Sequence, residues 1–168
     1  KKNNKFKDAY FNRFANTWYH GDFAEMKKTN GFIIHGRSDT TLNPGGVRLG
    51  TAEIYSEVEK FKEIKESIVV GQPWDNDIRI ILFLVMNEKF YFTEDLLKKI
   101  KIQIRKNASP RHVPKKIIVV KDIPRTKSGK IVELAVKNTI EGNDIKNKEA
   151  LANPEALEQF KNLKQLSN

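Results

Sequence analysis

The chain alternates between segments whose apolar residues recur every three or four positions, as in a helix, and short runs that are apolar throughout, as in a buried strand. This order predicts an α+β fold, with a small mixed or antiparallel sheet flanked by helices. The run 80–85 is apolar at every position, so it is expected to be the central strand, buried on both faces. The other expected strands are 32–35, 68–71 and 116–121, and the expected helices start at Thr51, Glu94, Ile131 and Pro154.

Polar residues mark the expected helix starts. Thr93 precedes two acidic residues and is expected to cap one helix, because its hydroxyl can accept a bond from a free backbone N–H. Thr51 is expected to cap the helix that carries Ile54, Val58 and Phe61. Asn153, directly before a proline, is expected to start a last helix in the tail.

The first 23 residues are rich in aromatic side chains. Phe6, Tyr10 and Phe14 are spaced to share one face of a helix, and further aromatic residues follow up to Phe23. The segment carries more apolar surface than its own length can bury. We therefore expect it to belong to a surface supplied by sequence outside this chain.

Composition narrows the class of protein. At 168 residues with 39% hydrophobic residues, the chain can bury one core. It has no cysteine and no apolar run near the ~20 residues of a membrane span, which predicts a cytoplasmic protein without membrane contact. The histidines His20, His35 and His112 show no metal-ligand spacing, so no metal site is expected and all three are interpreted as ordinary surface or loop residues.

The formal net charge of +10 implies anionic partners. By itself it does not choose between nucleic acid, a phosphorylated cofactor and a solvated lysine surface. No RNA- or DNA-binding signature is present, and the aromatic residues of the N-terminal segment are far in sequence from the densest lysines. A small basic nucleic-acid-binding domain is therefore kept as an alternative, and no nucleic-acid partner is expected.

The run 124–130 places three cations, Arg125, Lys127 and Lys130, between an expected strand and an expected helix. A helix N-terminus already carries partial positive charge, which disfavours a cation by about 0.3–1 kcal/mol. A loop this basic is expected to meet an anion.

Two further motifs precede this loop in a fixed order. They are Gly36-Arg37-Ser38-Asp39 and the segment from Leu42 to Ile54, which contains Pro44-Gly45-Gly46-Val47-Arg48. In this order the motifs resemble the C-terminal lid domain of the adenylate-forming enzymes, a superfamily of acyl-CoA synthetases, luciferases and nonribosomal adenylation domains. The resemblance implies that Lys130 is the catalytic residue of acyl-adenylation and that the lid rotates about a hinge at Asp39.

The same resemblance implies binding residues. Asp22, in Trp18-Tyr19-His20-Gly21-Asp22, would hold the ribose hydroxyls of ATP, and Arg37 would contact a phosphate. Arg48 would face the nucleotide in one lid orientation. Gly45 and Gly46 would line the pantetheine arm of CoA in the other, because glycine leaves room beside the backbone.

The C-terminal part, including 109–114, 131–137 and 147–157, resembles the branch of the superfamily that activates acetoacetate. This implies an AMP-forming acid–thiol ligase that converts acetoacetate, ATP and CoA through an acyl-adenylate, with Mg²⁺ bound to ATP by ligands outside this chain. A lid domain of the acetate- or propionate-activating enzymes is the alternative. Asp77-Ile78-Arg79 departs from the family, in which many relatives carry a Gly-Glu pair.

The resemblance also divides the chain. Residues 1–38 would be the end of a large N-terminal domain together with the approach to the hinge, and 39–168 would be the lid with an extra tail helix. The phosphate loop and the acyl pocket would lie in the N-terminal domain, which becomes the expected partner. The 168-residue chain alone is therefore expected to be inactive.

Overall fold

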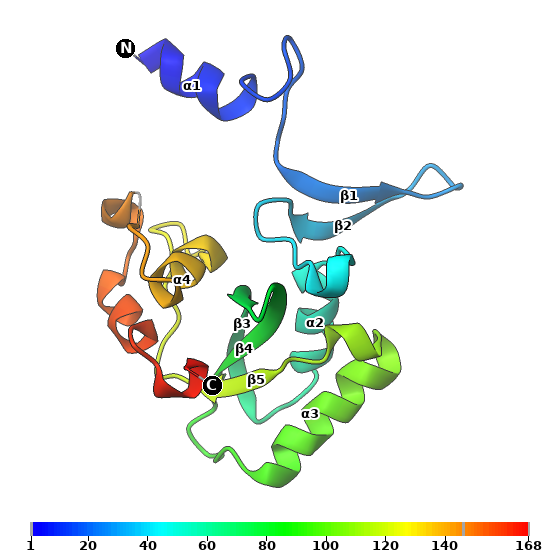
Figure 1. Cartoon of the computed structure of the whole chain (residues 1–168), viewed down its shortest axis with the longest axis vertical. Coiled ribbons are helices and arrows are strands. Elements are labelled where there is room, and N and C mark those ends of the chain that lie inside the picture. Colours follow the sequence, from blue (N-terminus) through cyan, green and yellow to red (C-terminus); the bar gives the residue numbers. More distant parts are fainter. Residues whose placement is uncertain (1, 146, 168) are drawn as a thin grey trace.

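A three-stranded sheet forms the centre of the chain, as seen in the computed structural model, which describes residues 2–145 and 147–167 (Figure 1). Strand β3 (Ile64–Trp74) pairs antiparallel with β4 (Asp77–Met86), and β4 pairs in parallel with β5 (Lys116–Val119). The order β3-β4-β5 places β4 in the middle. This confirms the predicted central strand and the predicted mixed sheet.

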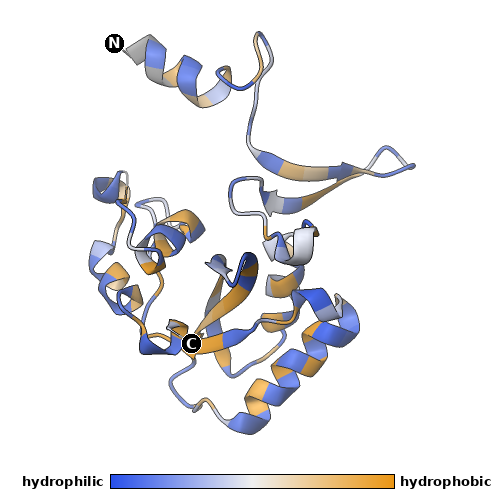
Figure 2. Ribbon diagram, viewed as in Figure 1, coloured by the Kyte–Doolittle hydropathy of each residue, from blue (hydrophilic) through white to orange (hydrophobic). Residues whose placement is uncertain are grey.

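The sheet separates two apolar cores, because side chains alternate between its faces. Leu82 and Leu84 of β4 pack on one face, and Ile81 and Phe83 pack on the other; all four are fully buried. Figure 2 shows the corresponding concentration of apolar residues along the strands and on the inner side of α3. A continuous apolar run is therefore needed in β4 because both of its faces are covered.

Helices cover both faces of the sheet. On one face lie α2 (Thr51–Val58) and α3 (Glu94–Asn107), with a short 3₁₀ turn, Pro110–His112, after them. On the other lie α4 (Glu133–Ile140) and the tail. The tail consists of 3₁₀ segments at Lys148–Ala150, Pro154–Phe160 and Lys164–Leu166.

The N-terminal part projects away from this body (Figure 1). Helix α1 (Lys2–Tyr10) is followed by a hairpin of β1 (Asp22–Met26) and β2 (Phe32–Arg37). Apolar side chains on the hairpin stay exposed, with Phe32 at 69% and Met26 at 67% of their full accessibility. Trp18 is half exposed as well. The segment leaves apolar surface uncovered within this chain, as its sequence predicted.

Three local predictions are wrong. Thr51 does not cap α2: Gly50 is the N-cap residue, Thr51 is the first helical residue, and the helix ends at Val58, before Phe61. Phe14 does not continue the face of α1, because that helix ends at Tyr10; its ring instead packs against Tyr19. The expected tail helix is a series of 3₁₀ turns.

The interpretation of the histidines also needs correction. His112 is buried, and its Nε2 lies 2.6 Å from Oε2 of Glu53 while its Nδ1 lies 2.8 Å from the Ser109 hydroxyl. His35 lies near the other oxygen of Glu53, 3.6 Å from Nδ1. These two histidines therefore connect β2, α2 and the turn after α3.

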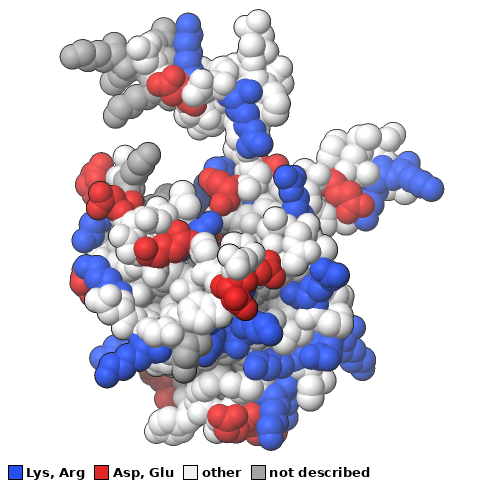
Figure 3. Space-filling view, viewed as in Figure 1, with Lys and Arg blue, Asp and Glu red and all other residues white. Residues whose placement is uncertain are grey.

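The cations are distributed over the surface without a single dominant patch on the face shown in Figure 3, where acidic side chains lie among them. Within the described residues, no cluster of three or more histidine, aspartate or glutamate side chains is arranged to hold a metal ion. Within the same residues, no helix has both the length and the apolar character that a bilayer crossing requires.

A buried carboxylate joins the two helices on one face of the sheet. Glu57 of α2 accepts hydrogen bonds from Lys60 Nζ at 2.6 Å, Gln103 Nε2 at 2.8 Å and Asn107 Nδ2 at 2.9 Å, the last two being on α3. The bond from Lys60, followed by those from the two amides, lowers the pKa of Glu57. The ionised form of Glu57 therefore stabilises the α2–α3 packing.

We predict that Glu57→Gln lowers the free energy of unfolding at neutral pH by about 1–2 kcal/mol, since hydrogen bonds to a charged group are lost. Because the folded-state pKa of Glu57 is lowered, its contribution is present above its unfolded pKa and is lost as the pH falls through the folded value. Urea unfolding at pH 7 and near pH 3.5 should show a smaller difference at the acidic pH. An equal difference at both would contradict this role.

Candidate functional site

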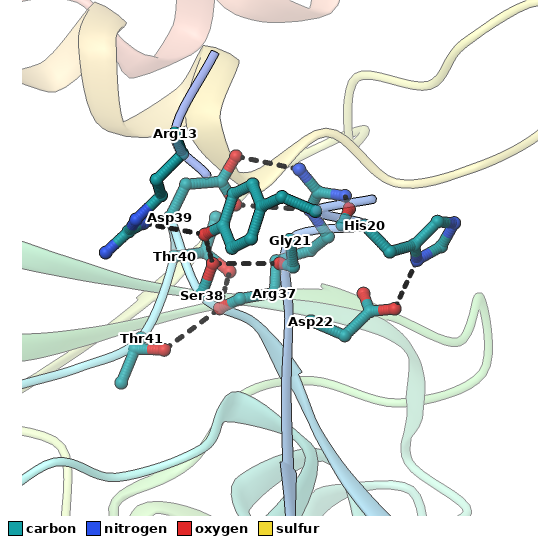
Figure 4. Close-up of polar contacts among 10 residues, drawn as sticks. Arg13, His20, Gly21, Asp22, Arg37, Ser38, Asp39, Thr40 and Thr41 are labelled. Atoms are coloured by element: carbon teal, nitrogen blue, oxygen red, sulfur yellow. Dashed lines mark hydrogen bonds and ion pairs between the residues drawn. The ribbon is translucent and has the colours of Figure 1, made fainter. Parts of the chain in front are cut away.

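The end of the β1–β2 hairpin brings three of the predicted residues together (Figure 4). Asp22 begins β1 and pairs in register with Arg37 at the end of β2. The guanidinium of Arg37 donates two bonds to the Asp39 carboxylate, at 3.2 and 3.0 Å, and one to the carbonyl oxygen of His20. The carboxylate of Asp22 lies 2.5 Å from Nδ1 of His20. Two acids and one guanidinium thus share one exposed end of the hairpin.

Ser38 fixes the chain where it leaves this hairpin. Its backbone N–H and its hydroxyl both donate to the carbonyl of Gly21, at 2.8 and 3.0 Å. Its hydroxyl also lies 2.5 Å from the hydroxyl of Tyr19, which accepts from Arg13 (Figure 4). Beyond Asp39, the carbonyl of Arg37 accepts from the N–H of Thr40 at 3.3 Å and from the hydroxyl of Thr41 at 3.0 Å. Hydrogen bonds therefore hold the backbone on both sides of the expected hinge residue.

The two carboxylates of this cluster act on the Arg37 guanidinium. Asp39 raises the pKa of Arg37, mainly through the two hydrogen bonds and further through its negative charge, to which Asp22 adds. The Arg37–Asp39 pair is about half exposed, so water and salt screen it. An incoming phosphate can therefore compete with Asp39 for the guanidinium.

The segment 42–49, here called the glycine turn, is closed by backbone hydrogen bonds at its base and is exposed on its outer side. Backbone bonds between Leu42 and Leu49, at 3.0 and 2.9 Å, close it. Gly45 and Gly46 have φ values of +58° and +75°, which glycine adopts without strain. A Cβ added at Gly46 would meet no atom within 4 Å. Arg48, two residues later, is exposed. The turn thus offers bare backbone to a ligand.

Asp77 holds the glycine turn in place. Both oxygens of its carboxylate accept from the N–H of Gly45, at 2.8 and 3.0 Å. This bond, with a second from the N–H of Ile78, lowers the pKa of Asp77. The β3–β4 turn therefore holds the glycine turn against the sheet.

A groove of about 720 Å³ adjoins the glycine turn. Gly45 and Arg111 both line the groove, and they lie close together, because a Cβ at Gly45 would be 3.3 Å from the guanidinium of Arg111. Trp74 contributes an aromatic surface, on which Arg79 stacks at 3.7 Å from the ring centroid. Lys115 lies in the same groove. Cationic and aromatic side chains here suit a phosphorylated, aromatic ligand.

Lys130 lies on a separate tight hairpin. The N–H of Thr126 donates to the carbonyl of Lys130 at 2.9 Å, and the N–H of Lys130 donates to the Thr126 hydroxyl at 3.1 Å. Gly129 makes the turn with φ at +82°. Lys127 and Lys130 are both exposed. Their ammonium groups therefore stand in solvent on a well-connected backbone.

One cation of this hairpin does not serve an external anion. Arg125 forms an ion pair with Glu66 of β3 at 2.5 Å and donates to the carbonyl of Gly129 at 3.2 Å. Each member of the pair is about a quarter exposed. Arg125 therefore meets an anion of the chain itself, Glu66, instead of an external one.

Within residues 2–145 and 147–167, no hydrogen bond or ion pair joins Lys130 to Asp22, Arg37 or Arg48. The structure thus brings together Asp22, Arg37 and Asp39 and leaves the glycine turn and Lys130 as separate groups. The sequence interpretation missed several contacts of these groups. No local sequence pattern predicts the contacts of Asp77, Arg111 and Glu66. The sequence predicts only a cap role for Asn153, which also contacts the lysine hairpin.

Comparison with known proteins identifies a domain within the chain. The family model of the AMP-binding enzyme C-terminal domain matches residues 53–130, from within α2 to Lys130. Over these residues the chain carries an AMP-binding enzyme C-terminal domain.

The chain is similar to acetoacetyl-CoA synthetases over nearly its whole length. The chain is 58% identical over 164 residues to the acetoacetyl-coenzyme A synthetase of Rhizobium meliloti (strain 1021) and 48% identical over 166 residues to the acetoacetyl-CoA synthetase of Xenopus tropicalis; each alignment covers 98% of this chain and 25% of the relative. The structure matches acetoacetyl-CoA synthetase from Streptomyces lividans with a TM-score of 0.85 and 36% identity, over 95% of this chain and 24% of that one. The chain spans about a quarter of the length of these relatives.

Gly50 lets the hairpin approach the start of α2. A Cβ at Gly50 would clash with the carbonyl oxygen of His35 in β2 and lie 2.8 Å from its Cβ. We predict that Gly50→Ala costs about 1–3 kcal/mol of stability or displaces the hairpin, as overpacking does.

Thermal melts and backbone amide NMR shifts around His35 measure both effects. Gly31→Ala is the control, because a Cβ there would be 3.7 Å from the Thr29 hydroxyl, an ordinary contact. Unchanged melting and unchanged shifts in Gly50→Ala would contradict the prediction.

Proposed function

We propose that the chain is the C-terminal part of an AMP-forming acid–thiol ligase that acts on acetoacetate. In the first half-reaction the carboxylate of acetoacetate attacks the α-phosphorus of ATP, giving acetoacetyl-adenylate and pyrophosphate. In the second the thiol of CoA attacks the acyl carbon, giving acetoacetyl-CoA and AMP. The similarity to acetoacetyl-CoA synthetases over nearly the whole chain carries this proposal.

We propose that residues 1–38 complete a large N-terminal domain and that 39–168 form the lid. The chain covers a quarter of its relatives, so most of the enzyme lies outside it. Exposed apolar side chains on α1 and the hairpin, including Phe6, Phe32 and Ile34, support contact with that domain. Asp39 lies in the short connection that follows β2, which ends at Arg37, and this position supports a hinge at the boundary.

We propose that ATP binds where the hairpin meets the lid. The exposed Asp22 carboxylate can accept both ribose hydroxyls, and the planar fork of Arg37 can exchange Asp39 for a phosphate. Arg48 would meet the nucleotide when the lid turns toward it. Mg²⁺ would bind to the phosphates of ATP and to residues outside this chain. The described residues offer no cluster of metal ligands.

For CoA, the open backbone at Gly45 and Gly46 would take the pantetheine arm. The adjoining groove would take the nucleotide end, with Arg111 and Lys115 as cations for its phosphates and Trp74 as an aromatic surface. The glycine turn and the groove thus share one face of the lid. A rotation about Asp39 would exchange this face for the one that carries Lys130.

Lys130 would act through its charge. As pyrophosphate leaves, negative charge grows on the oxygens around the α-phosphorus, and an ammonium held there stabilises the transition state. The exposed ammonium on a hydrogen-bonded hairpin suits this role, because the backbone is already ordered before the reaction. In the other lid orientation Lys130 would lie in solvent.

The alternatives find less support. Enzymes that activate acetate or propionate would differ in the acyl pocket, which lies outside this chain, whereas the relatives of highest identity quoted above act on acetoacetate by name. For a nucleic-acid-binding domain, the cations visible in Figure 3 are mixed with acids instead of forming one surface.

We predict that Lys130→Ala in the full-length enzyme lowers the rate of adenylate formation by about 10²–10³-fold or more, because a preorganised charge is lost. Pyrophosphate release measures this step. Thioester formation from supplied acetoacetyl-adenylate should remain close to the unmodified rate. Lys127→Ala removes the same charge from the same hairpin and is the matched control. Full adenylation in Lys130→Ala, or equal loss of both half-reactions, would exclude the proposed role.

A second prediction concerns the hinge. Asp39→Pro should restrict φ to about −65° and so favour one lid orientation, which slows one half-reaction more than the other. Asp39→Ala removes the same carboxylate from Arg37 but leaves the backbone free, so it separates the hinge effect from the loss of the ion pair. If the two variants behave alike in both half-reactions, Asp39 acts through its side chain and the hinge proposal fails.

A further inference from the structure

The hairpin that carries Lys130 is held from outside by the tail. Its first arm pairs with its second arm at Arg125 and Ile131, and with the tail at Thr126 and Leu151. The N–H of Lys127 donates to the carbonyl of Ala150 at 3.1 Å, and the N–H of Ala152 donates to the carbonyl of Arg125 at 2.8 Å. The first arm is thus the middle strand of a small three-stranded ladder.

One tail side chain makes three bonds to this arm. Oδ1 of Asn153 accepts from the N–H of Arg125 at 2.8 Å. Nδ2 of the same amide donates to the carbonyl of Ile123 at 3.0 Å and to the carboxylate of Asp122 at 2.6 Å. Asn153 is partly buried. Its amide therefore satisfies a donor and two acceptors where the chain enters the hairpin.

We propose that Asn153 is a positioning residue for Lys130: its amide fixes the entrance of the hairpin and so holds the lysine where the α-phosphate reacts. Only a side chain with both a donor and an acceptor can make these contacts. The ladder bonds to Ala150 and Ala152 extend the attachment, and the ion pair between Arg125 and Glu66 holds the same arm from the sheet. Among the described residues, no hydrogen bond or ion pair joins the side chain of Lys130 to any of these groups.

The position of a catalytic charge is energetically important. A displacement of about 1 Å by a distant mutation can lower a rate by about 10²-fold. The long lysine side chain adds mobility of its own, so the backbone under it must supply the order. The tail thus contributes to adenylation without contacting ATP. This inference rests on the role proposed for Lys130.

The test uses Asn153→Ala in the full-length enzyme. We expect adenylate formation to fall by about 10–100-fold, with thioester formation from supplied acetoacetyl-adenylate unchanged. Asn153→Asp keeps an acceptor for the Arg125 N–H but loses both donations and faces Asp122, so it should lose adenylation too. Asn143→Ala is the matched control, because that amide bonds only to Glu141 at the far end of α4 among its described side-chain contacts. Melting temperatures report whether the variants remain folded.

A double-mutant cycle separates positioning from a general structural effect. If Asn153 acts through Lys130, Asn153→Ala should have no further effect on adenylation in a Lys130→Ala background. Unchanged adenylation in folded Asn153→Ala and Asn153→Asp, or additive losses in the cycle, would overturn the inference while Lys130→Ala alone still supported the proposed function. Full adenylation in Lys130→Ala would instead remove the proposed function and this inference together.

Discussion

The burial of β4 on both faces is the constraint on which the other elements depend. Ile81 and Phe83 need a cover on one side, and Leu82 and Leu84 need one on the other, so neither layer of helices alone would complete the core. Tyr55 connects the layers around the sheet: its hydroxyl donates to Glu133 of α4 at 2.5 Å and accepts from the N–H of Val69 in β3 at 3.0 Å. Burial and the nearby Glu133 carboxylate raise the pKa of Tyr55 well above its usual value, so the hydroxyl remains a donor.

In this arrangement the candidate functional groups lie on loops that connect the elements, not on the strands of the sheet. The glycine turn precedes α2, and the lysine hairpin joins the end of β5 to α4, so both are attached to one rigid body. Polar contacts then fix each loop: Asp77 holds Gly45, and Glu66 with Asn153 holds the entrance of the lysine hairpin. Rotation of one rigid body would therefore move the glycine turn and the lysine hairpin together, which is the property that an alternating lid needs.

Charges were harder to interpret from sequence than apolar residues. The central strand and the cap at Thr93, which accepts from the N–H of Leu96 at 3.2 Å, were predicted from local pattern and are confirmed. Local pattern could not predict that Arg125 pairs with Glu66, 59 residues earlier, because only the folding of β3 beside the hairpin brings them together. The same holds for His112, because no local pattern indicates that it is buried against Glu53. It also holds for Thr51: the N-cap residue is Gly50, and β2 passes too close to Gly50 for a side chain there.

The sequence by itself determined the order of the elements, the strand buried on both faces, and the motifs that resemble the adenylate-forming enzymes, because these depend on residue type and short spacing. Only the tertiary structure decided which polar groups meet. Asp77 reaches Gly45 across 32 residues, and Asn153 reaches Arg125 across 28. Hydrogen bonds are directional and act over about 3 Å, so their partners depend on the packed positions of whole elements, whereas hydrophobic burial depends mainly on which face of an element is apolar.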